Sequence, residues 1–393
     1  MVDTAGVTPD APAATASVPA ISRPFKILRV AIAALMLVVL IDSAITILSY
    51  FPVGLDLVIP LKAAERWLDG GTVYLAEGFK NPELLPPFLY PPFVLPFVAP
   101  LTALPEMAVR WAWLVLEVLV GLWVCRRLAI AWWAMPLVFL WAPLLDGIWG
   151  GNVQLFLFAA FVAAFWRAPK RHDNHPEPRE LDAPGAVTPA LGAIAAGVAS
   201  LKVTQTQAWL AMFGRSPRAA LLGLAPWLLI VLVTLPLVGV ALYRDWLEQA
   251  ARASDPTWPA MGQSLLVYLP SAVFFGLTLV SFVLALRIRG RDTGIWIGLL
   301  MLLATPNMHV QTALFLLPAM LRIRLEFALL AAMLTSTHTN EGWWLGIAIV
   351  IGAMLAGERL PILREPPAET ARPAPPAPRP AAGPPPAAST ADT

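Results

Sequence analysis

The sequence predicts an all-α, polytopic integral membrane protein with about twelve transmembrane or re-entrant helices and a long first extracytoplasmic loop. Three observations predict this fold class. Of the 393 residues, 58% are hydrophobic and only 13% are charged, whereas soluble proteins carry about 25% charged residues. Apolar segments recur along most of the chain. Basic residues gather in alternate connections between these segments, as they do on the cytosolic side of membrane proteins.

Twelve apolar segments make up the predicted membrane body. They cover residues 27–49, 106–125, 128–147, 150–166, 188–201, 203–214, 219–242, 264–286, 294–305, 309–321, 325–337 and 341–357. A helix needs about 20 apolar residues to cross a bilayer core of about 30 Å. We therefore expect the shorter segments to be broken or re-entrant and shielded by their neighbours. The first segment carries three basic residues before or near its start, Arg23, Lys26 and Arg29, and is long enough to span, so we interpret it as a signal-anchor.

The two ends of the chain differ from the body in composition. Residues 1–22 are rich in Ala, Thr, Pro and Val, and residues 359–393 are rich in Pro and Ala. Such tracts cannot bury a hydrophobic core, so both are predicted to be disordered. The sequence therefore predicts one membrane domain, residues 23–358, between two cytosolic tails.

Lysine and arginine predict the orientation of this domain. With the N-terminus inside, 20 of the 27 basic residues fall in cytosolic connections or in the tails, and six fall outside. Lys202 alone lies within the membrane. This bias predicts cytosolic N- and C-termini. The result is a multi-pass protein of the cell (plasma or inner) membrane, with its unusual polar residues on the extracytoplasmic face.

The first outer loop, residues 50–105, carries the strongest local signals. Leu57, Leu61, Ala64 and Leu68 recur at helical spacing between charged residues, which predicts an amphipathic helix on the membrane surface. A Gly-Gly pair then ends it. Asp56 lies at the start of this helix, where it is either a helix-capping residue or a functional carboxylate.

Later in the loop, Phe88-Leu89-Tyr90-Pro91-Pro92 precedes an apolar run with two more prolines. Prolines at this density break a straight helix. The run predicts a kinked or re-entrant element, or a simple entry from loop into helix.

Polar residues also collect at later outer turns. They are Asp146, residues 150–154, Lys202 with Gln205, Gln263 with Ser264, and residues 305–309. An intramembrane lysine costs about 2.5–3.5 kcal/mol on insertion scales, so Lys202 is a functional candidate, the alternative being that it snorkels to the headgroups. Asp42, inside the first apolar segment, has two interpretations: it pairs with Lys202 or bonds to neighbouring helices.

An ordered set of short motifs supports a family resemblance over roughly residues 30–355. The motifs are Gly54-x-Asp56, Gly70-Gly71-x-x-Tyr74, Tyr90-Pro91-Pro92, Gly151-Asn152-x-Gln154, Leu201-Lys202, Gln263-Ser264 and Pro306-Asn307-x-His309. The chain resembles the polytopic glycosyltransferases of the GT-C fold, and most closely family 87, the polyprenol-phosphate-mannose-dependent α-mannosyltransferases. It departs from their pattern in having Gly-Asn-x-Gln for Gly-Gln-x-Asn, Lys202-Val203 for Lys-Pro, and no aromatic residue beside His309. These departures concern the sugar and acceptor more than the fold.

The resemblance implies a reaction and roles for several residues. A sugar, mannose in the family, moves from a polyprenyl-phosphate donor to a lipid-linked or glycan acceptor on the extracytoplasmic face, with inversion. Asp56 is then the catalytic base, and Lys202 and His309 contact the donor phosphate. The other implied substrate-binding residues are Gln154, Asn152, Asn307, Tyr90 and Gln263. We expect no cofactor, no metal and no nucleic-acid partner, because the sequence carries no nucleotide-phosphate loop and its single cysteine, Cys125, excludes a cysteine cluster.

Two other functions remain open at this stage. A lipid or solute transporter or flippase would use Asp42, Asp56, Asp146 and Lys202 as a relay along a central path. A non-catalytic membrane assembly subunit would use its Pro-rich tail to dock a partner.

Overall fold

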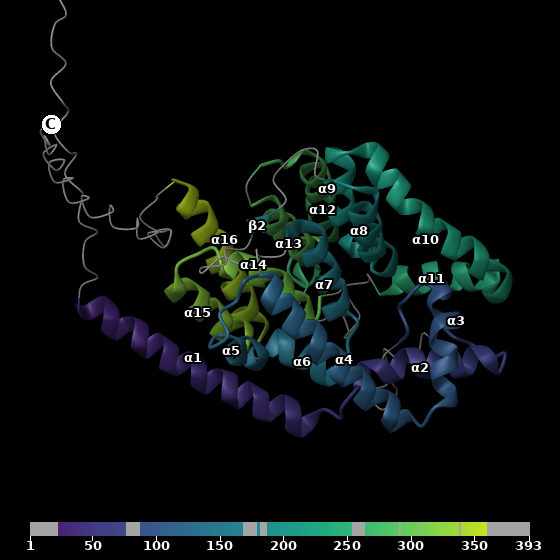
Figure 1. Cartoon of the computed structure of the whole chain (residues 1–393), viewed down its shortest axis with the longest axis horizontal. Coiled ribbons are helices and arrows are strands. Elements are labelled where there is room, and N and C mark those ends of the chain that lie inside the picture. Colours follow the sequence, from purple (N-terminus) through teal and green to yellow (C-terminus); the bar gives the residue numbers. More distant parts are fainter. Residues whose placement is uncertain are drawn as a thin grey trace, which may run out of the picture.

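The structure is a computed structural model that describes residues 23–75, 87–167, 179–180, 187–253, 264–290, 292–306, 308–337 and 339–359 (Figure 1). The first elements are α1 (Arg23–Tyr50), α2 (Leu55–Leu68), η2 (Pro92–Val94), α3 (Leu95–Val98), η3 (Ala99–Ala103), α4 (Glu106–Arg127), α5 (Met135–Leu140), α6 (Ala142–Gly150) and α7 (Gln154–Phe165). A two-residue pair, β1 (Trp166–Arg167) and β2 (Arg179–Glu180), follows. The predicted tails 1–22 and 360–393 lie outside the described residues.

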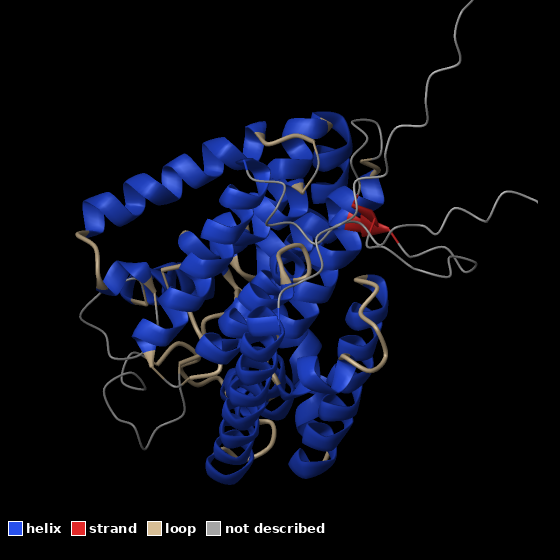
Figure 2. Ribbon diagram, turned by 90° about the vertical axis from the view of Figure 1, so that its left-hand side faces the viewer, coloured by secondary structure: helices blue, strands red, loops and turns tan. Residues whose placement is uncertain are grey.

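Helices also make up the second half of the chain. They are α8 (Pro189–Leu201), η5 (Val203–Gln205), α9 (Gln207–Arg215), α10 (Pro217–Val238), α11 (Val240–Arg252), η6 (Leu265–Val267), α12 (Ser271–Arg287), α13 (Thr293–Leu303), η7 (Val310–Leu316), α14 (Leu317–Met320), α15 (Leu325–Thr335) and α16 (Asn340–Arg359). Figure 2 shows that the small β1–β2 pair is the only sheet in the described part of the chain. The predicted all-α class is confirmed.

Each of the twelve predicted apolar segments contains a helix, but few of these helices are long. Within the described residues, four stretches are long and apolar enough to cross a bilayer: Arg29–Leu68, Glu106–Arg127, Pro217–Val238 and Asn340–Gly357. The first contains α1 and also α2, which with 14 residues is too short to cross alone. Seven further apolar helices have 10–17 residues. The number of crossings therefore stays a prediction.

Two of the predicted segments are broken where the sequence interrupts a regular helix. Segment 128–147 divides into α5 and α6 at Trp141, whose backbone is extended, and each of these helices has a proline in its first turn. Segment 309–321 begins as the 3₁₀ helix η7 before α14. These breaks lie close in the sequence to two of the predicted polar groups, Asp146 and His309.

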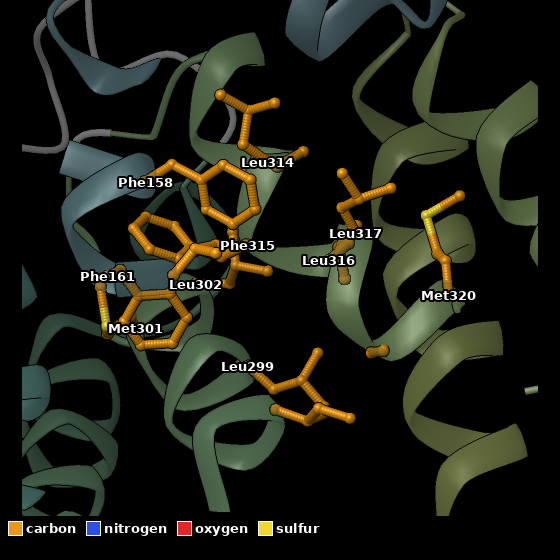
Figure 3. Close-up of a cluster of buried hydrophobic side chains, with 14 of the residues drawn as sticks. Phe158, Phe161, Leu299, Met301, Leu302, Leu314, Phe315, Leu316, Leu317 and Met320 are labelled. Atoms are coloured by element: carbon orange, nitrogen blue, oxygen red, sulfur yellow. The ribbon is translucent and has the colours of Figure 1, made fainter. Parts of the chain in front are cut away.

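Aromatic side chains of α7 and η7 form the centre of the core (Figure 3). Phe315 packs edge-on against Phe158 and Phe161, with ring centroids 5.5 and 5.0 Å apart. All three side chains are fully buried, and edge-to-face geometry is favourable for such rings. Cys125 is buried in the same cluster, in agreement with an inert packing role. The core thus holds η7, and the residues just before it, against α7.

Helix α1 lies along one edge of the body (Figure 1) and is tied to it near its basic end. The Arg29 guanidinium donates from Nε and Nη2 to Oε1 of Glu326 on α15, at 3.0 and 2.7 Å. Asp42, further along α1, is exposed. It is therefore not buried among the polar groups of the body.

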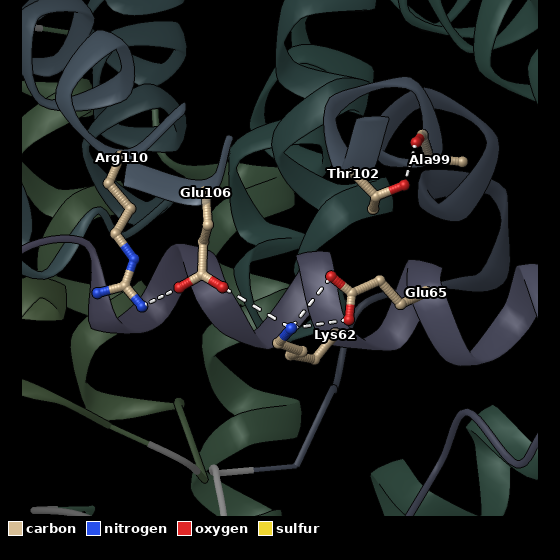
Figure 4. A network of polar contacts seen from close by, with 6 residues as sticks. All are labelled: Lys62, Glu65, Ala99, Thr102, Glu106 and Arg110. Carbon is tan, nitrogen blue, oxygen red and sulfur yellow. Dashed lines mark hydrogen bonds and ion pairs between the residues drawn. The ribbon is translucent and has the colours of Figure 1, made fainter. Parts of the chain in front are cut away.

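Helix α2 confirms the amphipathic pattern of the first outer loop. Leu57, Leu61 and Ala64 are buried, but Leu68 is 59% exposed because it is the last residue of the helix. On the polar side, Lys62 pairs with Glu65 and Glu106, and Glu106 pairs with Arg110 of α4 (Figure 4). The network joins the N-terminal end of α4 to α2.

Helix α11 holds the rest of the described first loop in place. Trp246 Nε1 donates to the Leu89 carbonyl at 3.0 Å, and Gln249 Nε2 donates to the Leu75 carbonyl at 3.1 Å. Within the loop, the Tyr74 hydroxyl donates to the Tyr90 carbonyl at 2.7 Å. After this point the chain enters η2, α3 and η3, which follow one another as a single short apolar helical stretch, Pro92–Ala103. Whether this stretch is kinked or re-entrant stays a prediction.

Candidate active site

A tight turn between α1 and α2 positions Asp56. Gly54 is the N-cap of α2 and has a φ of 70°, in the left-handed region that favours glycine. Its N–H donates to the Trp149 carbonyl at 2.7 Å, while Arg110 Nη1 donates to the Val53 carbonyl at 3.0 Å. Asp56 is the second residue of the helix and not its cap. The capping interpretation is therefore wrong.

Two glycines at the end of α6 allow this turn to approach closely. A Cβ on Gly150 would lie 3.3 Å from Asp56 Oδ2. Gly151 has a φ of 72°, and a Cβ there would lie 3.2 Å from both the Gly54 Cα and the Leu57 Cβ. The start of α2 and the end of α6 therefore approach each other at glycines: Gly54 before α2, and Gly150 and Gly151 at the end of α6.

Replacing Gly151 by alanine should disturb this contact. Alanine strains the left-handed backbone by about 1–2 kcal/mol, and its methyl group must push against α2. We expect Gly151→Ala to lower the thermal midpoint and to lower turnover further than the lost stability explains, because Asp56 moves. Thermal unfolding and initial rates measure both effects. Gly352→Ala is the matched control, since its added Cβ meets nothing within 4 Å; equal effects of the two changes would contradict this role.

Asn152 fixes the Asp56 carboxylate. Its side-chain oxygen accepts from the backbone N–H of Gln154 at 2.9 Å, so its amide nitrogen faces the other way. That nitrogen donates to Asp56 Oδ2 at 2.7 Å. Because a backbone N–H can only donate, the orientation of the Asn152 amide is determined.

Gln154 continues the connection to Lys202. Its Oε1 accepts from Lys202 Nζ at 2.8 Å and from Gln205 Nε2 at 3.0 Å. Lys202 is the C-cap of α8 and is half-buried. It bonds inward, so both snorkelling and pairing with the exposed Asp42 are wrong. The Gly-Asn-x-Gln motif therefore links a carboxylate and an ammonium group through hydrogen bonds.

The Lys202 environment has unused hydrogen-bonding capacity. Gln154 Nε2, Gln205 Oε1 and Thr204 Oγ1 are buried and have no partner among the described residues. Buried polar atoms are nearly always bonded to protein, water or ligand. The group around Lys202 is thus suited to receive a polar ligand.

His309 lies at the start of η7 and is exposed. Its ring accepts a hydrogen bond from the backbone N–H of Thr312, and the Thr312 hydroxyl accepts from the His309 N–H at 3.4 Å. With one ring nitrogen acting as acceptor, the other carries the proton of the neutral imidazole. Lys202 is close enough to act on the ring electrostatically. His309 can therefore donate a hydrogen bond beside Lys202.

Tyr90 lies within electrostatic range of Asp56, while two other predicted residues are not described. The Tyr90 ring packs at 5.6 Å from Phe88, and Asp56 lies close enough to act on its hydroxyl electrostatically. Gln263 and Asn307 lie outside the described residues. Residues next to them are in contact with each other: the buried hydroxyl of Ser264, which follows Gln263, donates to the carbonyl of Thr305, two residues before Asn307, at 2.8 Å.

Three further residues near Asp56 were not among the substrate-binding or catalytic residues that the resemblance implied. Arg110 holds the backbone just before Asp56. Asp146 accepts a hydrogen bond from Gln311. Glu117, fully buried in α4, accepts from Trp113 Nε1 at 3.0 Å and interacts electrostatically with Asp56. The available signal for Glu117 was a carboxylate within an otherwise apolar segment.

The described contacts connect a carboxylate, Asp56, to an ammonium group, Lys202, through Asn152 and Gln154. Among the described residues, no group of three or more His, Cys, Asp and Glu side chains could hold a metal ion. Ionisable groups held inside an apolar helical body mark a functional site, and a carboxylate and a cation are the groups that general base and electrostatic catalysis use.

The particular family follows from comparison with known proteins. The model of glycosyltransferase family 87 matches residues 88–306, which is more than half of the chain. The chain belongs to glycosyltransferase family 87 and is a membrane glycosyltransferase. No curated protein and no solved structure matches it. Asp56 and His309 lie outside the matched residues, so their place in the site rests on the contacts described above.

Proposed function

We propose that the protein moves a sugar, mannose, from a polyprenyl-phosphate donor to a lipid-linked or glycan acceptor on the extracytoplasmic face of the membrane. One observation carries this proposal: the hydrogen-bonded connection from Asp56 through Asn152 and Gln154 to Lys202. It provides a base for the acceptor and a cation for the leaving phosphate. The resemblance to family 87 mannosyltransferases supports mannose as the sugar.

The reaction is a single displacement. Asp56 takes the proton of the acceptor hydroxyl while that oxygen bonds to the anomeric carbon. The bond from this carbon to the phosphate oxygen breaks, and the electron pair leaves with the lipid phosphate. Lys202 and His309 stabilise the charge that develops there. Because one nucleophile replaces one leaving group, the anomeric configuration inverts.

The proposed topology follows the charge pattern of the chain. Arg29, Arg322 and Arg324 lie near one another around Glu326 and Asp292, at the side where the sequence bias predicts the cytosol. Asp56 begins α2, after the other end of α1. A GT-C-like fold with cytosolic termini and an extracytoplasmic site accounts for both positions.

The transporter alternative loses one of its four residues. Its relay needs Asp42 on a shared path with Asp56 and Lys202, but Asp42 is exposed and Lys202 bonds to Gln154. No observation in the described residues favours the assembly-subunit alternative.

A donor panel tests the proposed function. The purified full chain is mixed with polyprenyl-phosphate mannose, glucose or arabinose and with lipid extracts of the source membrane, and products are analysed by mass spectrometry. We expect transfer from the mannose donor and none from GDP-mannose. Transfer only from the nucleotide sugar, or no transfer from any polyprenyl-phosphate sugar, would overturn the proposal.

The pH dependence should report the state of Asp56. Burial raises the pKa of this carboxyl, while the hydrogen bond from Asn152 and the charge of Lys202 lower it less than burial raises it. A protonated Asp56 cannot accept a proton, so kcat/KM should fall on acidification at a pH above the ordinary aspartate pKa of about 3.9. Asn152→Ala removes a hydrogen bond that lowers the pKa of Asp56. In this variant, the fall of kcat/KM on acidification should therefore begin at a higher pH. A fall that begins at an unchanged or lower pH would contradict the assignment.

A further inference from the structure

Asp146 and Gln311 form a polar pair on the wall of the site. The Gln311 amide nitrogen donates to Asp146 Oδ2. Gln311 is only 8% exposed and Asp146 is half-buried. A Cβ on Gly147 would lie 3.6 Å from Gln311 Cγ, so α6 and η7 are packed together at this point. The pair joins segments 165 residues apart.

The pair faces the same space as Asp56. Residues four apart lie on one face of a helix, so Asp146 and Gly150 share a face of α6. Asp56 Oδ2 lies against Gly150 on that helix, at 3.3 Å from where a Cβ would be. Asp56 and Asp146 also interact electrostatically. The two carboxylates therefore border one region of the site.

The position along η7 places the pair toward the phosphate side. Gln311 follows His309 by two residues at the start of this helix. The Asp146–Gln311 pair thus joins α6, which contacts Asp56, to η7, which begins after His309. In a single displacement, the sugar ring lies between the base that activates the acceptor and the groups that bind the leaving phosphate.

We propose that Asp146 is a sugar-binding residue that accepts hydrogen bonds from ring hydroxyls of the transferred sugar, with Gln311 holding the carboxylate in place. This inference rests on the proposed function. A carboxyl group accepts hydrogen bonds through its oxygens, and Gln311 uses only one of these acceptor positions. The hydroxyl groups of a sugar can donate to the remaining positions. Asp146 would then help to select which sugar is transferred.

The selection mechanism predicts a dependence on individual hydroxyls. A site built to bond a substrate hydroxyl discriminates against an analogue that lacks it, because its own polar group is left without a partner. Removing the right hydroxyl should lower kcat/KM of the unaltered protein by roughly 10- to 100-fold. The same removal should have little effect once Asp146 is replaced.

The experiment compares Asp146→Asn and Asp146→Ala with the unaltered full chain. Donors are polyprenyl-phosphate mannose and its 2-, 3-, 4- and 6-deoxy forms, and kcat/KM is measured for each. Binding of sugar-free polyprenyl phosphate is measured separately and should be unchanged, because the phosphate contacts are elsewhere. Asp42→Asn, on the exposed face of α1, is the matched control. Asp146→Asn keeps an acceptor for Gln311 and so guards against loss of folding.

The outcomes separate this inference from the proposed function. A deoxy penalty that disappears in both Asp146 variants, with unaltered polyprenyl phosphate binding, supports the inference. A penalty of the same size in all proteins, or weaker phosphate binding in the Asp146 variants, overturns it while sugar transfer stands. If the unaltered chain transfers no sugar from any polyprenyl-phosphate donor, the proposed function and the inference both fail.

Discussion

Asp56→Asn is expected to lower kcat for sugar transfer by about 10²- to 10⁴-fold, the usual contribution of a general base. The asparagine oxygen can still accept from Asn152, whose amide lies 2.7 Å from the present carboxylate. The fold around Gly54 and Gly151 should therefore persist. Substrate binding should change little, because the lost step is proton removal. Initial rates at saturating donor and acceptor measure the effect.

The control for this change is Asp42→Asn, which alters an exposed aspartate of α1. Its rate should match that of the unaltered protein. A thermal midpoint that is the same for both variants shows that lost activity is not lost folding. Turnover of Asp56→Asn close to that of the unaltered protein would sink the assignment of the base.

Lys202→Ala should have the second-largest effect. It removes the ammonium group that lies 2.8 Å from Gln154 Oε1, and with it the proposed charge partner of the donor phosphate. Loss of one preorganised group that stabilises transition-state charge costs about 10²- to 10³-fold in kcat. Binding of sugar-free polyprenyl phosphate should weaken as well, because the charge also acts in the ground state. Kinetics with varied donor, together with direct lipid-phosphate binding, measure the two effects.

Lys62→Ala provides a lysine control for this change. Lys62 is half-exposed on α2 and pairs with Glu65 and Glu106, away from Gln154. Donor affinity and kcat should be unchanged in this variant. The phosphate role is wrong if Lys202→Ala retains normal donor affinity and turnover, or if Lys62→Ala weakens donor use equally.

The apolar segments show how far local pattern predicts this fold. Helix formation depends on nearby residues, so segments such as 106–125 and 219–242 correspond closely to α4 and α10. Segment 128–147 was predicted as one unit but is divided at Trp141. The prolines that divide it are visible in the sequence; the direction that the chain takes afterwards depends on packing with distant helices.

For the site residues, the sequence identified the motifs, but only the structure shows which residues contact one another. The motifs containing Asp56, Asn152, Gln154 and Lys202 were each recognisable, but not their order of contact. From the sequence alone, Asp56 could equally well be a helix cap. The structure excludes this, because Gly54 is the N-cap of α2 and the Asp56 side chain bonds Asn152 beyond α6. The Asp146–Gln311 pair had no local signal that would join its members.

The all-α apolar body, the bias of basic residues and the resemblance to family 87 can be read from the chain without a structure, because each depends on composition or short-range spacing. Only packing between distant segments shows that Asp56 bonds Asn152, that Lys202 bonds inward to Gln154, and that Asp42 stays apart. These contacts join residues 48 to 96 positions apart. The first of them forms because Gly54, Gly150 and Gly151 let two backbones approach to a distance that side chains would prevent.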